Sequence, residues 1–299
     1  VSLWIKIPLL AILVLVVGAL GYAYSLFNDA KVTVNERMFE PVQSIDHDLT
    51  RKKVSATEPI NVLLLGIDAE SGGKGRSDAI MVLALHPENN AMQIISIPRD
   101  TRTLIVGRGY EDKINHAYAF GGVNMAVETV EHFLDIDIDF YVAMNMTGLK
   151  ELVDQLGGIT VHNDIEWQDG PYHFPTGKVA LTDGDMTMKF VRMRKQDPSG
   201  DFGRTKRQRE VIQGIIHKGA SIGSVTKIGG MIDILGNNMT TNMEFNDMTK
   251  LFSGYRNTMN NVTSYQVQGS GTYIDRIYYL IVSDEEVAKV QKLINDGDV

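Results

Sequence analysis

The sequence predicts one α/β domain, built on a single mixed β-sheet with helices on both faces and preceded by one transmembrane helix. Short apolar runs that end in turn residues alternate with longer segments whose apolar residues recur at helical spacing. A long uncharged apolar run lies near the N-terminus. The sequence contains no cysteine, which excludes a disulfide framework, a thiolate nucleophile and a cysteine-based zinc site.

The apolar run over residues 7–27 has the length of one membrane span, because about 20 apolar residues cross a bilayer as a helix. Aromatic residues lie at the two ends of this span, as is common at membrane interfaces: Trp4 at one end, and Tyr22 and Tyr24 at the other. A cleaved signal peptide is the alternative, but the run is longer than a usual signal-peptide core. We expect an uncleaved signal anchor over residues 1–27 and a membrane-proximal stalk over residues 28–59, partly helical over residues 34–49.

The globular domain is expected over residues 60–299. The expected strands cover residues 61–66, 79–86, 92–97, 140–144, 159–161 and 262–267. A turn over residues 87–90 predicts that the second and third of these strands form a hairpin. The expected helices cover residues 123–134, 148–156, 205–218 and 283–295, and a helical region opens at residues 113–118. Residues 167–178 predict a loop or a small hairpin, because prolines and glycines interrupt them.

Basic residues gather within residues 191–210 of a chain whose formal net charge is −8. Two groups share a face, the first if its segment is extended and the second if it is helical: Arg192 with Arg194, and Arg204 with Arg207 and Gln208. Guanidinium groups facing each other across a turn suit a pyrophosphate, because each planar fork binds phosphate oxygens bidentately. A solvated basic helix end is the alternative. Nucleic-acid binding is disfavoured, because the basic region is confined to this stretch.

Acidic and basic residues also fall at the predicted strand ends, where open α/β sheets place their sites. Asp68 and Asp78 flank one loop, and two carboxylates beside phosphate oxygens form a hard oxygen site for Mg²⁺. Ordinary turn carboxylates are the alternative. Arg76 and Arg99 each lie close to an acid in the sequence, and surface ion pairs of little energetic weight are the alternative there.

Other chemistries lack their motifs. The sequence has no HExxH spacing, no G-x-S-x-G elbow and no P-loop, since Gly72–Gly75 lacks the GK[ST] ending. A basic clamp, two acids and no obvious nucleophile predict phosphoryl-group chemistry in which the substrate supplies the nucleophile. The membrane anchor suggests that the phosphate ligand is a lipid.

Five motifs in order carry a resemblance to a known family. They are LLLGID (residues 63–68), RSDAIM (76–81), SIPRDT (96–101), KINHAYAFGG (113–122) and VRMRKQDPSGDFGRTKRQRE (191–210). With the N-terminal span, the chain resembles the LytR-CpsA-Psr family over the whole domain from about residue 60. One departure is LTDGDMTMKF over residues 181–190, where Asp185 stands in place of the usual Glu.

The resemblance implies an enzyme of a Gram-positive bacterium, anchored as a single-pass type II protein in the cell membrane with its catalytic domain outside. Such enzymes transfer an anionic glycopolymer, for example wall teichoic acid, from an undecaprenyl-pyrophosphate carrier to peptidoglycan. The acceptor is generally the C6 hydroxyl of N-acetylmuramic acid, and the product is a phosphodiester. The implied partners are therefore the lipid-linked polymer, peptidoglycan and the cytoplasmic membrane, and no nucleic acid.

The same resemblance implies roles for individual residues, with Asp68 and Asp78 holding Mg²⁺. Catalysis is assigned to Arg76, Asp78, Arg99, Arg192 and Arg194. Pyrophosphate binding is assigned to Arg99, Lys113, Arg192, Arg194, Asp201, Arg204 and Gln208.

The prenyl chain is expected in an elongated apolar channel that starts at the arginines and runs under a helix. The apolar faces of residues 123–134 and 149–156 are the candidate walls, and ordinary core packing is the alternative for both. Two other functions are kept open. One is a hydrolase of lipid-linked pyrophosphates, with water replacing the sugar hydroxyl. The other is a non-enzymatic membrane-bound regulator of cell-wall genes, which the absence of a visible helix-turn-helix disfavours.

Overall fold

The computed structural model describes residues 25–68, 75–220, 231 and 234–297, and a mixed β-sheet lies at its centre. The strands of this six-stranded sheet follow the order β11-β6-β1-β2-β3-β12. Their bounds are β1 (Ile60–Ile67), β2 (Ser77–His86), β3 (Ala91–Ser96), β6 (Phe140–Asn145), β11 (Met239–Thr241) and β12 (Asn261–Gln266). The β1–β2, β2–β3 and β6–β11 pairs are antiparallel, whereas β1–β6 and β3–β12 are parallel. The predicted mixed sheet and its β2–β3 hairpin are confirmed.

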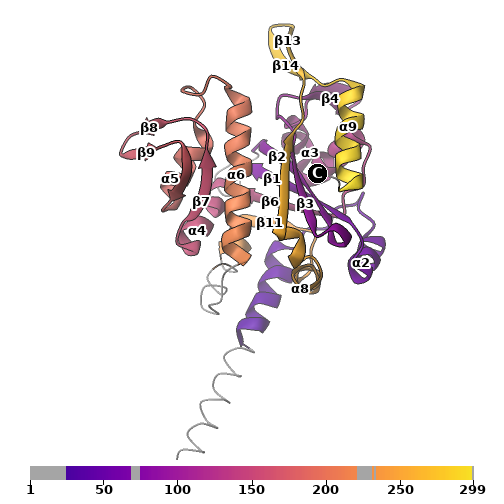
Figure 1. The fold of residues 1–299 in the computed structure, drawn as a ribbon. Helices are drawn as coiled ribbons and strands as arrows, with labels where there is room; N and C mark the ends of the chain where they lie inside the picture. Colours follow the sequence, from indigo (N-terminus) through magenta and orange to yellow (C-terminus); the bar gives the residue numbers. More distant parts are fainter. Residues whose placement is uncertain (1–24, 69–74, 221–230, 232–233, 298–299) are drawn as a thin grey trace, which may run out of the picture.

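Helices cover both faces of this sheet, as predicted (Figure 1). On one face, called the α3 face, lie α3 (His116–Leu134) and α9 (Asp284–Asp296). On the other, called the α6 face, lie α4 (Met146–Leu156), α6 (Asp201–Ala220) and α8 (Phe245–Gly254). Because successive strand residues point to opposite faces, Leu63 packs toward α3 and its neighbour Leu64 packs toward α6.

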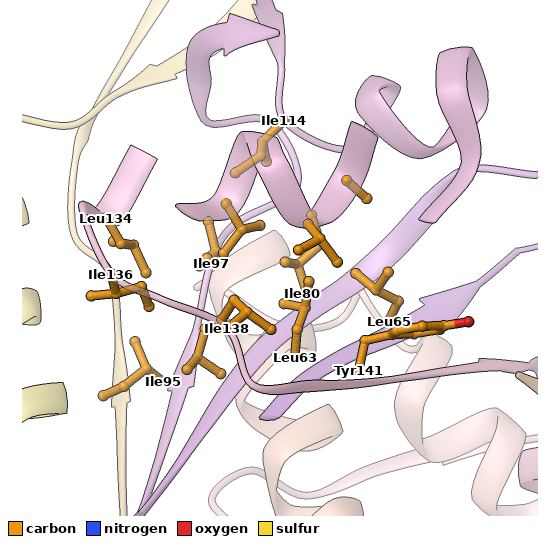
Figure 2. Packing of buried hydrophobic residues seen from close by; sticks show 14 of the residues in the cluster. Leu63, Leu65, Ile80, Ile95, Ile97, Ile114, Leu134, Ile136, Ile138 and Tyr141 are labelled. Atoms are coloured by element: carbon orange, nitrogen blue, oxygen red, sulfur yellow. The ribbon is translucent and has the colours of Figure 1, made fainter. Parts of the chain in front are cut away.

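The α3 face forms the largest core of the domain. Leu63, Ile95, Val127 and Leu134 have no exposed surface, and they pack together with Tyr141 (Figure 2). Of the two helices on this face, α9 has a side-chain cap at its N-terminus, and α3 has none. Ser283 accepts a hydrogen bond from a backbone N–H of the first turn of α9, which is the cap expected from the sequence.

A second apolar cluster lies beside the α6 face. It is formed by β7 (Ile159–Asn163), β8 (Trp167–Asp169), β9 (Tyr172–Phe174), β10 (Gly177–Leu181), α4 and α5 (Gly184–Arg192). Trp167 and Phe174 stack with their ring centroids 3.9 Å apart. The β8–β9 pair is the small hairpin predicted within residues 167–178.

Two further hairpins were not anticipated from the sequence. The first pairs β4 (Arg102–Ile105) with β5 (Tyr110–Lys113), and the second pairs β13 (Ser270–Ile274) with β14 (Ile277–Ile281). Short single-turn helices complete the connections: η1 (Val34–Met38), η2 (Pro87–Asn89) and η3 (Arg256–Asn260).

The segment predicted as a stalk, residues 28–59, packs on the domain. Val42 and Ile45 belong to the core of the α3 face, and a bridge joins Phe39 to Thr241 of β11. α2 (His47–Ala56) follows, with Asp46 as its N-cap. The packing of the domain therefore begins before residue 60.

The predicted membrane anchor over residues 1–27 lies outside the described residues except for its last three. Residues 25–33 are helical and lie at one end of the molecule (Figure 1). Among the residues that the structure describes, no helix is both long and apolar enough to span a bilayer.

Candidate functional site

Asp78 stands at an irregularity of the sheet that turns its side chain toward Arg99. Gly66 of β1 pairs with Ala79 of β2 and Ile67 pairs with Ser77, so Asp78 is an extra residue in a β-bulge. Its carboxylate accepts hydrogen bonds from Arg99 Nη1 at 2.6 Å and from Asn115 Nδ2 at 3.2 Å. The bulge therefore brings an acid of β2 to the guanidinium that follows β3.

Asp201, the first residue of α6, lies among three arginines. Its Oδ1 is 2.9 Å from Arg204 Nη2, 3.8 Å from Arg99 Nη2 and 3.9 Å from Arg194 Nε. None of these approaches has hydrogen-bonding geometry for that oxygen. The carboxylate thus gathers the guanidiniums from three different segments by charge while leaving most of their N–H donors uncommitted.

Asp100 extends this network to β5. Its Oδ1 accepts a hydrogen bond from Lys113 Nζ at 2.6 Å, and its Oδ2 lies 3.8 Å from Arg99 Nε. Acids and bases therefore alternate from Lys113 through Asp100 to Arg99 and on to Asp78 and Asp201. We call Arg99, Lys113, Arg194, Asp201 and Arg204 the clamp.

The balance of burial and neighbouring charge raises the pKa of Arg99 and lowers that of Arg204. Burial alone would lower the pKa of Arg99, but the carboxylates of Asp78, Asp201 and Asp100 outweigh it and leave this pKa raised. Burial does lower the pKa of Arg204, and repulsion from Arg99 adds to this effect against the attraction of Asp201. Neighbouring carboxylates therefore offset the burial of positive charge less at Arg204 than at Arg99. A bound anion would stabilise the charge of Arg204.

A cavity of about 410 Å³ opens on the clamp. Arg99, Lys113, Arg194 and Asp201 form its polar wall, and side chains of the β13–β14 hairpin form another wall. Two guanidinium groups and one ammonium group at one cavity favour a ligand with several anionic oxygens.

An apolar cavity of about 260 Å³ lies under the α6 face, between the sheet and helices α4 and α6. Leu64 and Val142 form its floor, and Leu149 of α4 and Ile215 of α6 form its walls. Among the described residues that line it, only Asn145 and Gln208 carry polar side chains. Leu149 and Leu152 of the expected wall over residues 149–156 line this cavity, but no arginine of the described part of the chain does. The face of residues 123–134 packs into the core on the α3 face instead. A prenyl channel that starts at the arginines therefore stays a prediction.

Gln208 of α6 lines the apolar cavity. It lies one helical turn after Arg204 and one turn before Ile212, which faces the apolar cavity. Its Oε1 is buried and has no hydrogen-bond partner among the described residues. A polar group thus marks the boundary where the clamp ends and the apolar wall begins.

Arg76 and Arg192 do not reach the clamp. Arg76 is exposed, and its backbone oxygen accepts a hydrogen bond from the backbone N–H of Asp68. Arg192 is the last residue of α5 and lines a different hollow, beside Asp185 and Lys189. The expectation that Arg192 and Arg194 point to one side required an extended segment, but α5 ends between them, so they point apart. The catalytic roles that the family resemblance implies for Arg76 and Arg192 stay predictions.

Two polar residues of the site were not assigned from the sequence. Asn115 binds Asp78, and Asp100 binds Lys113, as described above. Both lie inside motifs already recognised, two residues after Lys113 and directly after Arg99. Their closeness in sequence to Lys113 and Arg99 was the only local signal, and it does not fix the direction of either side chain.

The donor set at the strand ends fits a divalent cation by its chemistry. Asp68 is exposed after β1, and Asp78 lies at the start of β2 across one loop. Mg²⁺ binds through one or two carboxylates together with substrate phosphates and water, so two acids suffice. Among the described residues, no cluster of three or more such ligands occurs, so the protein alone offers a partial site.

Comparison with known proteins gives a consistent result. The LytR_cpsA_psr family model matches residues 22–296. The polyisoprenyl-teichoic acid–peptidoglycan teichoic acid transferase TagU of Bacillus cereus (strain AH820) is 46% identical over 273 residues, covering 91% of this chain and 89% of the relative. The protein of the same name from Halalkalibacterium halodurans is 43% identical, covering 92% of this chain and 91% of the relative.

Solved structures agree with the sequence matches. The crystal structure of Bacillus subtilis TagU is similar with a TM-score of 0.67 and 40% identity, covering 80% of this chain and 96% of that one. A structure of TagT bound to LIIa-WTA is similar with a TM-score of 0.69 and 32% identity, covering 80% of this chain and 90% of that one.

Proposed function

This chain belongs to the LytR-CpsA-Psr family, and from that premise we propose that it transfers a teichoic acid or similar anionic glycopolymer from a polyprenyl-pyrophosphate carrier to peptidoglycan. One observation carries the proposal. One helix, α6, lines both the cavity at the clamp, through Asp201 and Thr205, and the apolar cavity, from Gln208 onward. A prenyl pyrophosphate has the same two parts in the same order.

The clamp binds and orients the pyrophosphate in this proposal. Arg99, Arg194 and Arg204 present guanidinium forks, and Lys113 adds a compact charge. Asp78 and Asp201 hold these cations in place before the substrate arrives, so little reorganisation is needed as charge develops on the phosphates. Such preorganised electrostatic stabilisation is commonly the largest contribution to catalysis of phosphoryl transfer.

The reaction forms one phosphorus–oxygen bond and breaks another. The acceptor hydroxyl oxygen attacks the phosphorus that carries the polymer, and the bond to the bridging oxygen of the pyrophosphate breaks. The prenyl phosphate leaves with the electron pair of that bond. The hydroxyl proton passes to a base, for which Asp201 of the clamp and Asp78, which contacts Arg99, are the candidates.

Magnesium is the proposed cofactor, held by Asp68 and Asp78. When bound, it would neutralise charge on the phosphate oxygens and on the leaving group. Asp78 also accepts hydrogen bonds from Arg99 and Asn115, which fix its orientation without using all of its lone pairs.

The apolar cavity is the proposed site of the prenyl tail. Burying each CH₂ group stabilises binding by roughly 0.8 kcal/mol, so a few units of the tail supply much of the affinity. α6 runs from the end of the molecule that carries the β13–β14 hairpin toward the end where residues 25–33 lie (Figure 1). A tail following α6 would therefore point toward the N-terminal segment, which fits an anchor over residues 1–27 and a domain outside the cytoplasmic membrane.

The test uses the full chain in detergent with a polyprenyl-pyrophosphate-linked teichoic acid precursor, with and without peptidoglycan strands. We expect a phosphodiester-linked product and release of prenyl phosphate that both require the strands. Cleavage at the same rate without strands would make the protein a hydrolase of lipid-linked pyrophosphates and would overturn the proposal.

A further inference from the structure

The β13–β14 hairpin places two tyrosines on one face over the clamp cavity. Tyr273 and Tyr278 are direct partners in the strand register, so their side chains lie on the same side of the hairpin. Both line the cavity that opens on Arg99 and Arg194, together with Leu280 of the same face. The rings meet edge to face with centroids 5.6 Å apart.

These rings are unusually open for aromatic side chains. Tyr273 is 74% exposed and Tyr278 is 37% exposed, although Leu280 on the same face is only 2% exposed. Among the described residues, neither tyrosine belongs to an apolar core cluster of the domain. A paired, exposed aromatic surface beside a polar cavity is a feature that binding explains better than folding does.

The base of the hairpin is tied to the clamp itself. The backbone N–H of Leu280 donates to the backbone oxygen of Asp100 at 2.9 Å, and Leu280 also bridges to Thr101. Gly271 is needed for the position of Tyr278, because a Cβ there would lie 2.7 Å from the tyrosine hydroxyl oxygen. The tyrosine face is thus held at a fixed place relative to the acid that binds Lys113.

The charges of the clamp also reach Tyr278. Burial raises the pKa of its hydroxyl, and the carboxylates of Asp100 and Asp201 raise it further against the effect of Arg194. The hydroxyl therefore stays protonated at neutral pH and can donate a hydrogen bond.

We propose that Tyr273 and Tyr278 form a stacking surface for the first sugar of the donor, the one esterified to the phosphate held by the clamp. This inference rests on the proposed function. A sugar joined to that phosphate by one ester bond must lie in the same cavity, whichever polymer follows it. A pyranose presents a face of C–H groups, which complements the negative face of an aromatic ring, and its rim of hydroxyls faces water.

Two other occupants fit this face less well. A prenyl chain has the apolar cavity under α6 available to it, on the far side of Gln208. The hairpin also lies at the opposite end of the molecule from residues 25–33, so it faces away from the end assigned to the membrane (Figure 1). The acceptor glycan is not tied to the phosphate before the reaction, so the donor sugar is the group that the cavity must always accommodate.

The experiment compares two probes on the full chain in detergent. One is a polyprenyl pyrophosphate without sugar, and the other is the same lipid carrying one N-acetylhexosamine. Tyr273→Ala and Tyr278→Ala are expected to weaken binding of the sugar-bearing probe about three- to tenfold, the range of one aromatic contact, and to leave the bare probe unchanged. Tyr273→Phe and Tyr278→Phe keep the ring and are expected to retain most of the affinity.

The hairpin supplies its own matched control. Ile277 is 49% exposed and lies next to Tyr278 on the opposite face, so Ile277→Ala is expected to change neither probe. Equal weakening of both probes by the alanine variants would show damage to the clamp, and no weakening of either would remove the stacking role. Both results overturn the inference.

An acceptor arm separates the two sources of sugar. If the alanine variants raise the KM for peptidoglycan strands while affinity for the sugar-bearing probe stays unchanged, the surface serves the acceptor, and the inference for the donor is wrong. The binding measurement does not depend on transfer. A chain that binds the sugar-bearing probe through these rings but never transfers it would contradict the proposed function and leave this inference standing.

Discussion

The two faces of the central sheet differ, although the same strands supply both. On the α3 face, side chains such as Leu63 and Val127 have no exposed surface and fill the space under the helix. On the α6 face, the neighbouring residue Leu64 borders a cavity of about 260 Å³. Apolar residues thus serve as packed core on one side and as the wall of a binding cavity on the other.

Small residues and polar contacts explain where the hollow forms. Gly66 and Ala79 line the cavity and contribute little volume to it. A Cβ at residue 66 would lie 2.9 Å from that of Ala79, so the strands meet closely there. Nearby, the buried guanidinium of Arg209 binds Ser96 and Gln266, which fixes α6 on the sheet by polar groups. The helix is therefore held in place without needing apolar side chains to fill the space beside it.

The largest expected effect is a difference in the free energy of unfolding between substitutions on the α3 face and on the α6 face. Leu63→Ala removes a fully buried side chain from the α3 face and is expected to lower the free energy of unfolding by about 3–5 kcal/mol. Leu64→Ala, one residue away on the same strand, should lower it by roughly half as much, because Leu64 already borders empty space. Urea unfolding followed by circular dichroism measures both. Equal losses would show that the α6 face is packed as tightly as the other.

Filling the cavity gives the next effect. Val142→Phe places a ring in the cavity and is expected to weaken binding of a long-chain prenyl pyrophosphate on the order of 100-fold, the equivalent of displacing three or four CH₂ groups. Binding of inorganic pyrophosphate should not change. The matched variant Val82→Phe on the α3 face should instead destabilise the fold by about 1–3 kcal/mol through overpacking. If Val142→Phe left long-chain binding intact, the cavity would not hold the tail.

Much of the fold could be predicted because each buried strand has a recognisable local sequence pattern. The runs that became β1, β2, β3 and β6 are apolar and end in turns, and each was expected within a few residues of its observed bounds. The β13–β14 hairpin was missed because its turn residues, Asp275 and Arg276, both have positive φ, which usually marks glycine or asparagine. The sequence of residues 28–59 predicts a stalk, because the side chains that the domain buries there, such as Val42 and Ile45, are scattered among charges.

The site was predictable in its chemistry and less so in its geometry. Asp78 and Arg99 were expected at strand ends, and they are in contact there. That contact depends on a bulge, which nothing in the residue types around Asp78 indicates. The cavity under α6 could not be predicted from the apolar pattern either. Periodicity shows which residues face the sheet, but not whether their side chains fill the space between helix and sheet. That is why residues 123–134 and 149–156 looked equivalent.

The next effect compares two arginines close in sequence, of which only one lines the cavity at the clamp. Arg194 lines the clamp cavity, whereas Arg192 lies in another hollow with Asp185. Arg194→Lys keeps the charge but loses the fork, and we expect about a tenfold loss in kcat/KM, near 1.4 kcal/mol. Arg192→Lys should cost less than threefold. Equal losses would show that Arg192 turns into the clamp when substrate binds, as the family resemblance implies.

The last expected effect concerns the ion pair that fixes the start of α6. Asp197 and Arg207 are both about 6% exposed in their side chains, and Arg207 Nη1 donates to Asp197 Oδ2 at 2.6 Å. Arg207 Nη2 also donates to the backbone oxygen of Met193, so this pair holds the loop that carries Arg194. The side chains named above at the centre of the α3 face are apolar instead.

The pH dependence of stability reveals this pair. Burial alone would raise the pKa of Asp197, but hydrogen bonds from Arg207 and from the backbone N–H of Ser199 outweigh it and hold this pKa below its usual value. The stabilisation is therefore complete above the unfolded-state pKa, about 4, and is lost as the pH falls through the lower folded-state pKa. Asp197→Asn should be less stable than wild type at pH 7, and the difference should shrink between pH 5 and pH 3. Thermal unfolding across that range measures it, with Asp185→Asn as an exposed control. A constant difference at every pH would mean that Asp197 acts through shape rather than charge.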